Sequence, residues 1–318
     1  MAETDTSRRL TVLLASPRGF CAGVERAIAI VERAIASYGR PVFVRHEIVH
    51  NRFVVERLEA MGAIFVEELQ DVPDDRPVVF SAHGVSRAVV SEARSRKLLY
   101  LDATCPLVSK VHHEATRHHT SGRHVLLIGH RGHPEVVGTM GQLPPGAITL
   151  VETVEDARTI EVPEPSRLAY TTQTTLSVDE AAGIIAALRR RFPMIHGPKT
   201  DDICYATTNR QQAVKAIAPG ADLVIVLGSA NSSNARRLVE VALAHGARAA
   251  ILLASARDLD ERVLEGVERL GITAGASTPE ELVAGLLDAL GRRFAVEIEE
   301  ISVTAETTHF RLPRALGA

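Results

Sequence analysis

The stretch DLVIVLGSANSSNARRLVEVALA, residues 222–244, shows the pattern on which the fold of this chain depends. It begins with a short apolar run rich in β-branched residues, which is typical of a buried strand. The polar cluster Ser232, Ser233 and Asn234 follows, and apolar residues then recur three or four positions apart, as on one face of a helix. A strand that runs through a polar turn into a helix predicts one βα step of a parallel sheet.

The same pattern occurs three times, and each copy begins at a cysteine. The three cysteines of the chain are Cys21, Cys105 and Cys204. Helix-like sequence follows each of them, then a β-rich run, then a polar cluster that opens another helical segment. The clusters begin at His50, His133 and Ser232, which are 29 (21 to 50), 28 (105 to 133) and 28 (204 to 232) residues after their cysteines. Such regular spacing indicates an internal repeat.

The second half of each copy repeats the pattern more loosely. An extended stretch leads into a helix start and places His83, Thr174 and Ser277 at the turn, 62 (21 to 83), 69 (105 to 174) and 73 (204 to 277) residues after the cysteines. Ligands collect at the carboxyl ends of parallel strands. Three similar α/β units with parallel sheets can therefore present one thiol and two polar turns each to a common centre.

The repeat also predicts the domain boundaries. We expect α/β units at residues 10–103, 104–202 and 203–300, followed by a C-terminal tail at residues 301–318.

Composition excludes several classes of protein. Apolar residues make up 46% and charged residues 24% of the chain, as in ordinary globular proteins. The net charge is −3 and no run of Lys and Arg stands out, which argues against nucleic acid as a partner. No apolar run reaches the roughly 18–20 residues that a membrane span needs, and the N-terminus lacks an apolar signal core. We expect a cytoplasmic protein without a membrane partner.

The cysteines predict a metal centre. An odd number cannot pair completely within one chain, and a reducing compartment disfavours disulfides. Three thiolates form a site that is one ligand short of closure, which suits a cubane iron–sulfur cluster with one open iron. Zinc is the alternative. Single cysteines far apart in sequence favour a cluster, because structural zinc sites usually draw on closely spaced cysteine pairs.

Histidines suggest two further metal sites, and we expect neither of them to form. Residues 46–50, HEIVH, fit the H-E-x-x-H signature of zinc proteases, which works only on a helix. Here the five residues continue a β-rich run, so we expect them at a strand end. The four histidines on the helix after Cys105 are expected to form a solvated or partly buried helix face; they are His112, His113, His118 and His119.

Among the candidate residues, His133, Glu135 and Thr174 are the group best suited to acid–base chemistry. The helix macrodipole favours an ionised Glu135 at a helix start. An anionic substrate and a metal centre beside it would instead raise its pKa and suit it to deliver a proton. The alternative is a structural helix-start glutamate. Helix capping is likewise the alternative for the Ser, Thr and Asn residues, although a helix start is also an anion site.

Nine motifs, in order from about residue 10 to residue 300, carry a resemblance to a known family. They are GFCAGVERAI, HEIVHN, SAHGVS, DATCPLVSKVH, GHPEV, TQTTLS, DDICYATTNRQ, GSANSSN and GITAGAS. The chain resembles the 4-hydroxy-3-methylbut-2-enyl diphosphate reductases, which are the terminal enzymes of the non-mevalonate route of isoprene biosynthesis.

The resemblance implies a pseudo-threefold, trefoil-like arrangement of the three units around one [4Fe-4S] cluster per chain. It implies that the cluster ligands are Cys21, Cys105 and Cys204. It implies that the residues holding the diphosphate are His50, His83, His133, Ser232, Ser233, Asn234 and Ser277. Thr174 would contact the substrate hydroxyl, and Glu135 would be the proton source.

The implied reaction removes the hydroxyl of the allylic diphosphate and gives isopentenyl or dimethylallyl diphosphate, with two electrons entering through the cluster. A ferredoxin or flavodoxin would supply them, since no G-x-G-x-x-G fingerprint indicates a bound nicotinamide. Three alternatives are open: another three-cysteine enzyme such as a quinolinate synthase, a non-catalytic iron–sulfur sensor, and a zinc protease.

Overall fold

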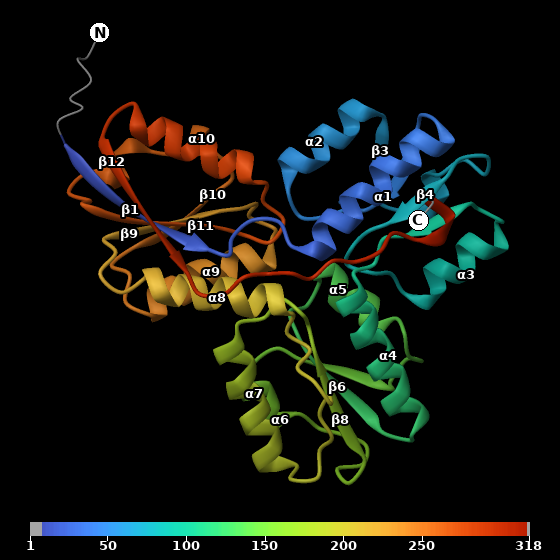
Figure 1. The fold of residues 1–318 in the computed structure, drawn as a ribbon. Helices are drawn as coiled ribbons and strands as arrows, with labels where there is room; N and C mark the ends of the chain where they lie inside the picture. The colour runs from blue at the N-terminus through green and yellow to red at the C-terminus, as the bar shows by residue number, and fades with distance from the viewer. Residues whose placement is uncertain (1–7, 317–318) are drawn as a thin grey trace. The chain divides into compact units, whose positions relative to one another are not determined.

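The computed structural model describes residues 8–316, and Figure 1 shows alternating strands and helices along the chain. The described strands form three sheets, with the orders β10-β9-β11-β1-β12, β3-β2-β4-β5 and β7-β6-β8. Every neighbouring pair of strands in these sheets is parallel. The predicted α/β class with three parallel sheets is confirmed.

The chain divides into two compact units, and each is described by itself. The five-stranded unit comprises the described part of Met1–Cys21, together with His50–Val54 and Tyr205–Thr308. The two-sheet unit comprises Ala22–Val49, Val55–Cys204 and the described part of His309–Ala318.

The five-stranded unit contains the largest sheet. Its strands are β1 (Arg9–Ser16), β9 (Leu223–Leu227), β10 (Ala250–Leu253), β11 (Arg269–Ala274) and β12 (Ala295–Ser302). Its helices are α8 (Tyr205–Ile217), α9 (Ser233–Ala244) and α10 (Glu280–Gly291), and short 3₁₀ turns occur at Ala256–Asp258 and Glu261–Leu264.

The two-sheet unit contains the other two sheets. The four-stranded sheet comprises β2 (Val42–Arg45), β3 (Ala63–Val66), β4 (Val78–Phe80) and β5 (Tyr100–Asp102), and the three-stranded sheet comprises β6 (His124–Ile128), β7 (Ile148–Val151) and β8 (Leu168–Thr172). The helices are α1 (Ala22–Tyr38), α3 (Arg87–Ser95), α4 (Pro106–Thr120), α5 (Pro134–Met140), α6 (Val154–Thr159) and α7 (Val178–Arg191). Helix α2 (Arg52–Met61) begins in the five-stranded unit and continues in this one.

Strand β9 shows why an apolar run becomes a central strand. All five of its residues are buried. Leu223, Ile225 and Leu227 pack into the cluster that includes α10, whereas Val224 and Val226 pack into the cluster that includes α9. Alternate side chains point to opposite faces of a strand, so a strand covered by helices on both faces must be apolar throughout.

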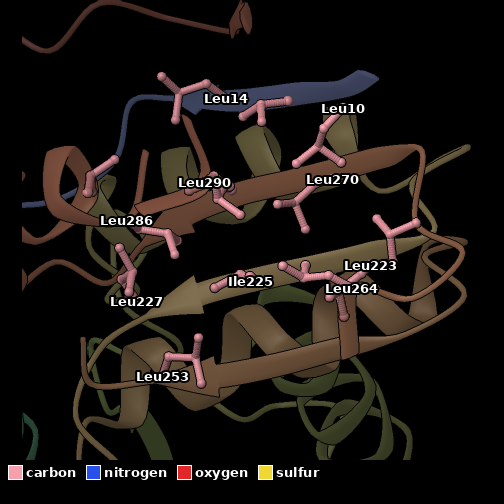
Figure 2. Packing of buried hydrophobic residues seen from close by; sticks show 14 of the residues in the cluster. Leu10, Leu14, Leu223, Ile225, Leu227, Leu253, Leu264, Leu270, Leu286 and Leu290 are labelled. Atoms are coloured by element: carbon pink, nitrogen blue, oxygen red, sulfur yellow. The ribbon is translucent and has the colours of Figure 1, made fainter. Parts of the chain in front are cut away.

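Figure 2 shows the first of these clusters, in which leucines of several elements lie along the sheet. Leu10 and Leu14 come from β1, Leu270 from β11, and Leu286 and Leu290 from α10. Complete burial of one such side chain contributes roughly 1.5–3 kcal/mol to folding. Segments from the two ends of the sequence are therefore held in one core.

The position of β1 differs from the segment 10–103 expected from the repeat. Its residues pair with β11, with Val12 opposite Leu270, and with β12, where Arg9 lies opposite Ala295 and Ser16 opposite Ser302. The N-terminal strand thus belongs to the sheet of residues 223–302, and Ile301 and Ser302 of the expected tail belong to a strand. Hydrophobic periodicity predicts a strand but not its partner, because the partner is selected by long-range hydrogen bonds and packing.

The segment His46–His50 lies between β2 and α2 and is not helical. His46 has a φ of 60°, in the left-handed region, so the backbone turns sharply where the strand ends. The two histidines of the H-E-x-x-H pattern therefore do not share a helix face, and the zinc-protease alternative loses its structural basis.

The helices predicted after the cysteines are present. Helix α1 begins at Ala22, α4 at Pro106 and α8 at Tyr205, directly after the three cysteines. No helix in residues 8–316 is long and apolar enough to cross a membrane.

Candidate active site

Glu135 and Thr174 are joined by two hydrogen bonds in the interior of the two-sheet unit. Glu135 lies in the first turn of α5, and its carboxyl is 2% exposed. Its Oε1 accepts a hydrogen bond from the Thr174 backbone N–H at 2.6 Å, and its Oε2 accepts one from the Thr174 hydroxyl at 2.9 Å. Two donors from one residue fix the orientation of the carboxyl, which is what a proton-transfer group needs.

Burial raises the pKa of the Glu135 carboxyl from its ordinary 4.5 to about 7. The two hydrogen bonds from Thr174 oppose that rise, and the negative charge of Asp202 adds to it. Desolvation disfavours the ionised carboxylate, and here it outweighs the donors that stabilise the charge. The group can therefore hold a proton near neutral pH, as the proton-source interpretation requires.

His133 is bonded to the backbone of this acid, and His83 packs against His133. His133 is the N-cap of α5, and its Nδ1 accepts a hydrogen bond from the Glu135 backbone N–H at 3.2 Å. The rings of His133 and His83 meet edge to face, with 5.8 Å between their centroids. The Ser81 hydroxyl lies 3.4 Å from Nδ1 of His83. The structure brings both predicted histidines of this unit together.

Two glycines, Gly84 and Gly138, allow the turn after β4 to approach α5 closely. Gly84, directly after His83, has a φ of 81°, and a Cβ on it would lie 2.7 Å from the His112 ring. A Cβ on Gly138 of α5 would lie 3.2 Å from the Gly84 carbonyl oxygen. The turn after β4 and helix α5 therefore pack backbone to backbone, which places His83 against His133.

Two of the cysteines lie at turns of the same unit. The Cys105 N–H donates to the Ala82 carbonyl at 2.9 Å, and the Cys204 N–H donates to the Thr174 carbonyl at 3.1 Å. The backbone thus ties Cys105 to the turn that carries His83, and Cys204 to the residue that binds Glu135.

In the five-stranded unit, Cys21, His50 and Ser277 lie around the turn after β11. The Cys21 N–H donates to the Ala276 carbonyl at 3.2 Å, and the Ser277 hydroxyl donates to the His50 carbonyl at 2.9 Å. Nδ1 of His50 lies 3.3 Å from the Asn231 amide nitrogen. These residues come from four separate stretches of the sequence.

The start of α9 contributes the remaining predicted residues of this unit. Ser232 is the N-cap and accepts a hydrogen bond from the Ala235 N–H at 3.3 Å, so the capping interpretation is correct for its side chain. Ser233 and Asn234 are buried in the first turn. Both polar atoms of the Asn234 amide are buried and have no hydrogen-bond partner within residues 8–316. Leaving a buried amide unsatisfied is unfavourable by roughly 1–3 kcal/mol, so Asn234 is suited to bind a ligand.

Asp202 is a buried carboxyl that the sequence patterns did not single out. Its Oδ2 accepts a hydrogen bond from the Thr172 N–H at 3.0 Å, and its Oδ1 lies 3.2 Å from the ammonium of Lys110. Burial raises the pKa of the Asp202 carboxyl from 3.8 to about 6, although the Thr172 N–H and the Lys110 ammonium both act to lower it. Its signals in the sequence were its place in the motif DDICYATTNRQ and its position two residues before Cys204.

The four histidines of α4 do not form one common face: His118 is buried, His112 and His119 are half-buried, and His113 is exposed. The expected solvated or partly buried face describes only some of them. Burial lowers the pKa of His118 and that of His112 to about 4. Both rings are therefore neutral at physiological pH.

The cysteines fit the predicted cluster in type and setting. No disulfide joins them, and each directly precedes a helix, where the macrodipole favours a negatively charged thiolate. Three thiolates suit iron–sulfur chemistry. Within residues 8–316, no three His, Cys, Asp or Glu side chains are grouped as a metal site requires, so the ligand set stays a prediction.

Comparison with known proteins gives a consistent result. The model of the LytB protein family matches residues 12–291. The chain is 64% identical over 317 residues to the 4-hydroxy-3-methylbut-2-enyl diphosphate reductase of Gluconobacter oxydans (strain 621H), covering 98% of this chain and 94% of the relative. It is 66% identical over 308 residues to the protein of the same name from Phenylobacterium zucineum (strain HLK1), covering 97% and 98%.

Solved structures show the same similarity. The E-1-hydroxy-2-methyl-but-2-enyl-4-diphosphate reductase of Plasmodium falciparum matches with a TM-score of 0.92 and 38% identity, covering 97% of both chains. A structure of (E)-4-hydroxy-3-methyl-but-2-enyl diphosphate reductase, described as the terminal enzyme of the non-mevalonate pathway, matches with a TM-score of 0.62 and 29% identity, covering 88% of this chain and 99% of that one.

Proposed function

The chain belongs to the LytB protein family, and we propose that it reduces (E)-4-hydroxy-3-methylbut-2-enyl diphosphate to isopentenyl diphosphate and dimethylallyl diphosphate. The balance of the reaction is substrate plus two electrons and two protons, giving product and water. The observation that carries the proposal is the buried Glu135 carboxyl, which has a pKa of about 7 and is bonded to the Thr174 hydroxyl.

We assign to these two residues the proton that joins the departing hydroxyl group. The second proton of the balance is added to a carbon of the allyl group. Protonated Glu135 can pass its proton from Oε2 to the Thr174 hydroxyl, 2.9 Å away, while that hydroxyl gives its own proton to the departing oxygen of the substrate. The hydroxyl is then restored, and the oxygen leaves as water. Burial of Glu135 supports this assignment, because it keeps bulk water away from the acid and holds the proton on it near neutral pH.

We assign the cluster ligands to Cys21, Cys105 and Cys204, one [4Fe-4S] cluster per chain. When bound, the cluster would supply the two electrons and a Lewis-acidic iron for the substrate oxygen. A ferredoxin or flavodoxin type of protein is the proposed donor, and cytoplasmic location stays a prediction.

We assign binding of the substrate diphosphate to the polar residues at the strand-to-helix turns. Ser232 caps α9, and Ser233 and Asn234 lie in the first turn of this twelve-residue helix, whose N-terminus favours an anion. The unsatisfied amide of Asn234 supports a role in binding. His50, His83, His133 and Ser277 complete the proposed set.

The function is tested by anaerobic purification followed by iron, sulfide and zinc analysis and a turnover assay. We expect about four iron and four sulfide per chain, and conversion of the substrate to the two products with an artificial one-electron donor. Stoichiometric zinc without iron would favour the zinc alternative. A cluster without turnover would favour the non-catalytic sensor.

Replacing Asn234 by alanine should raise KM for the substrate about tenfold or more while the cluster spectrum stays unchanged. Stability should change little, because the amide makes no hydrogen bond within the described residues. Steady-state kinetics and thermal unfolding measure the two effects. Ser255→Ala, which removes the cap of a short turn in the same unit, serves as the control. A lower melting temperature with normal KM would make Asn234 a structural residue.

A further inference from the structure

Each helix that follows a cysteine carries a basic residue at nearly the same position. Arg26 on α1 is five residues after its cysteine (21 to 26), Lys110 on α4 five (105 to 110) and Arg210 on α8 six (204 to 210). Each of these side chains binds carbonyl oxygens of the segment that leads into a different cysteine. None of the three residues has a part in the proposed chemistry.

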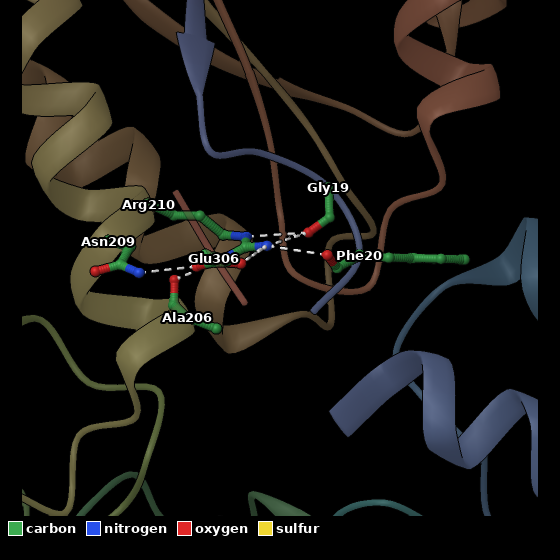
Figure 3. Close-up of polar contacts among 6 residues, drawn as sticks. All are labelled: Gly19, Phe20, Ala206, Asn209, Arg210 and Glu306. Carbon is green, nitrogen blue, oxygen red and sulfur yellow. Dashed lines mark hydrogen bonds and ion pairs between the residues drawn. The ribbon is translucent and has the colours of Figure 1, made fainter. Parts of the chain in front are cut away.

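Arg210 holds the segment before Cys21. Figure 3 shows its guanidinium reaching from α8 toward the loop that contains Gly19 and Phe20. Nε and Nη2 donate to the Gly19 carbonyl at 3.0 and 2.7 Å, and Nη2 donates to the Phe20 carbonyl at 3.1 Å. The side chain is fully buried, and Glu306 balances its charge with an Oε1 that lies 2.9 Å from Nη1.

Arg26 holds the segment before Cys105 in the same way. Its Nη1 donates to the carbonyls of Ala103 and Thr104 at 3.3 and 3.1 Å, the two residues directly before the cysteine. Its Nε donates to the Arg311 carbonyl at 2.9 Å.

Lys110 holds the segment before Cys204. Its ammonium donates to the carbonyls of Thr200 and Asp201 at 2.7 and 2.8 Å. It also lies 3.2 Å from Asp202, whose other carboxylate oxygen accepts the Thr172 N–H at the end of β8. The carboxylate thus joins the ammonium to the strand that precedes Thr174.

We propose that Arg26, Lys110 and Arg210 are positioning residues. Each holds the backbone segment before a cysteine other than the one that precedes its own helix, and the three contacts together form a cycle. The helix after Cys21 holds the approach to Cys105, the helix after Cys105 holds the approach to Cys204, and the helix after Cys204 holds the approach to Cys21. Backbone carbonyls in loops need partners, and charged donors are the strong ones. Only the consequence for the cluster rests on the proposed function.

The cycle is tested by hydrogen exchange of the purified full-length protein, followed by mass spectrometry. Lys110→Met should speed exchange of the Cys204 amide about tenfold or more, Arg26→Met that of Cys105, and Arg210→Met that of Cys21. Each of these amides is bonded to a carbonyl within its own unit, so local opening exposes it. In each variant, the cysteine whose amide exchanges faster is therefore a different one from the cysteine that precedes the mutated helix.

Conservative variants separate positioning from general destabilisation. Lys110→Arg should restore slow exchange at Cys204, because it keeps the charge and the donors. Arg210 is fully buried, so Arg210→Lys, which keeps the charge but offers fewer donors, replaces the methionine variant if that one does not fold. Arg248→Met, at an exposed ion pair with Asp222, is the matched control and should leave all three cysteine amides unchanged.

Cluster release gives a second measurement. Release of iron to a ferrous chelator should be several-fold faster in each methionine variant than in the parent and in Arg248→Met. The proposed positioning role would be wrong if exchange became faster uniformly along the chain. It would also be wrong if exchange became faster only in the mutated helix. A parent protein without iron and sulfide would instead overturn the proposed function, and the exchange pattern would still report on the three contacts.

Discussion

Glu135→Gln is expected to reduce the substrate at least about a hundredfold more slowly than the parent, because loss of one positioned general acid typically lowers a rate about 10²–10⁴-fold. Glutamine keeps the size of the side chain, and its Oε1 can still accept the Thr174 N–H, whereas its amide nitrogen would donate to the Thr174 hydroxyl oxygen. It has no acidic proton to give. The cluster content and KM should stay close to those of the parent. Turnover with an artificial one-electron donor measures the effect.

The pH dependence identifies the same group. The pKa of Glu135 is raised to about 7, so the protonated fraction falls as pH rises through that value. We expect kcat of the parent to fall above about pH 7 and the residual rate of Glu135→Gln to lack that descending limb. The raised pKa also means that protonated Glu135 stabilises the fold fully below about pH 4.5 and that this contribution is lost as pH rises through about 7. The glutamine variant should not show that loss.

Glu155→Gln is the matched control for this experiment. Glu155 lies at the start of another short helix of the same unit, and its side chain is 71% exposed. It should leave turnover and its pH profile unchanged. Turnover of Glu135→Gln within a few-fold of the parent would show that the proton has another source.

Cys105→Ser is expected to abolish stable cluster binding and, with it, turnover with any electron donor. A serine hydroxyl is not a soft thiolate ligand, and two thiolates are too few to hold a cubane. The fold should persist, since the backbone hydrogen bond from residue 105 to Ala82 does not involve the sulfur. Iron and sulfide analysis, the absorption spectrum and circular dichroism measure these outcomes.

The corresponding serine variants of Cys21 and Cys204 serve as internal comparisons, because the chain has no other cysteine. All three should lose the cluster to the same extent. A variant that kept four iron and four sulfide would remove its cysteine from the ligand set, and the threefold interpretation would fail with it.

Local sequence predicted many of the strands and helices. The complete burial of the apolar run β9, the helices that begin after each cysteine and the capping role of Ser232 all follow from residue type and spacing over a few positions. The repeat extended these local signals into three parallel sheets, and the structure confirms them.

The pattern H-E-x-x-H shows where spacing alone is ambiguous. The same five letters suit a zinc site on a helix or a strand end, and the backbone decides between them. His46 lies in the left-handed region directly after β2, which ends the strand and prevents a helix there.

Only the tertiary structure decided which segments lie together and what charge they carry. The sequence determined that β1 is a strand, whereas its place between β11 and β12 depends on hydrogen bonds to residues more than 250 positions away. Sequence also placed Glu135 at a helix start, where the macrodipole favours ionisation, but burial against Thr174 reversed that preference and raised its pKa to about 7. Strand partners and desolvation depend on packing between distant parts of the chain, so a local pattern does not contain them.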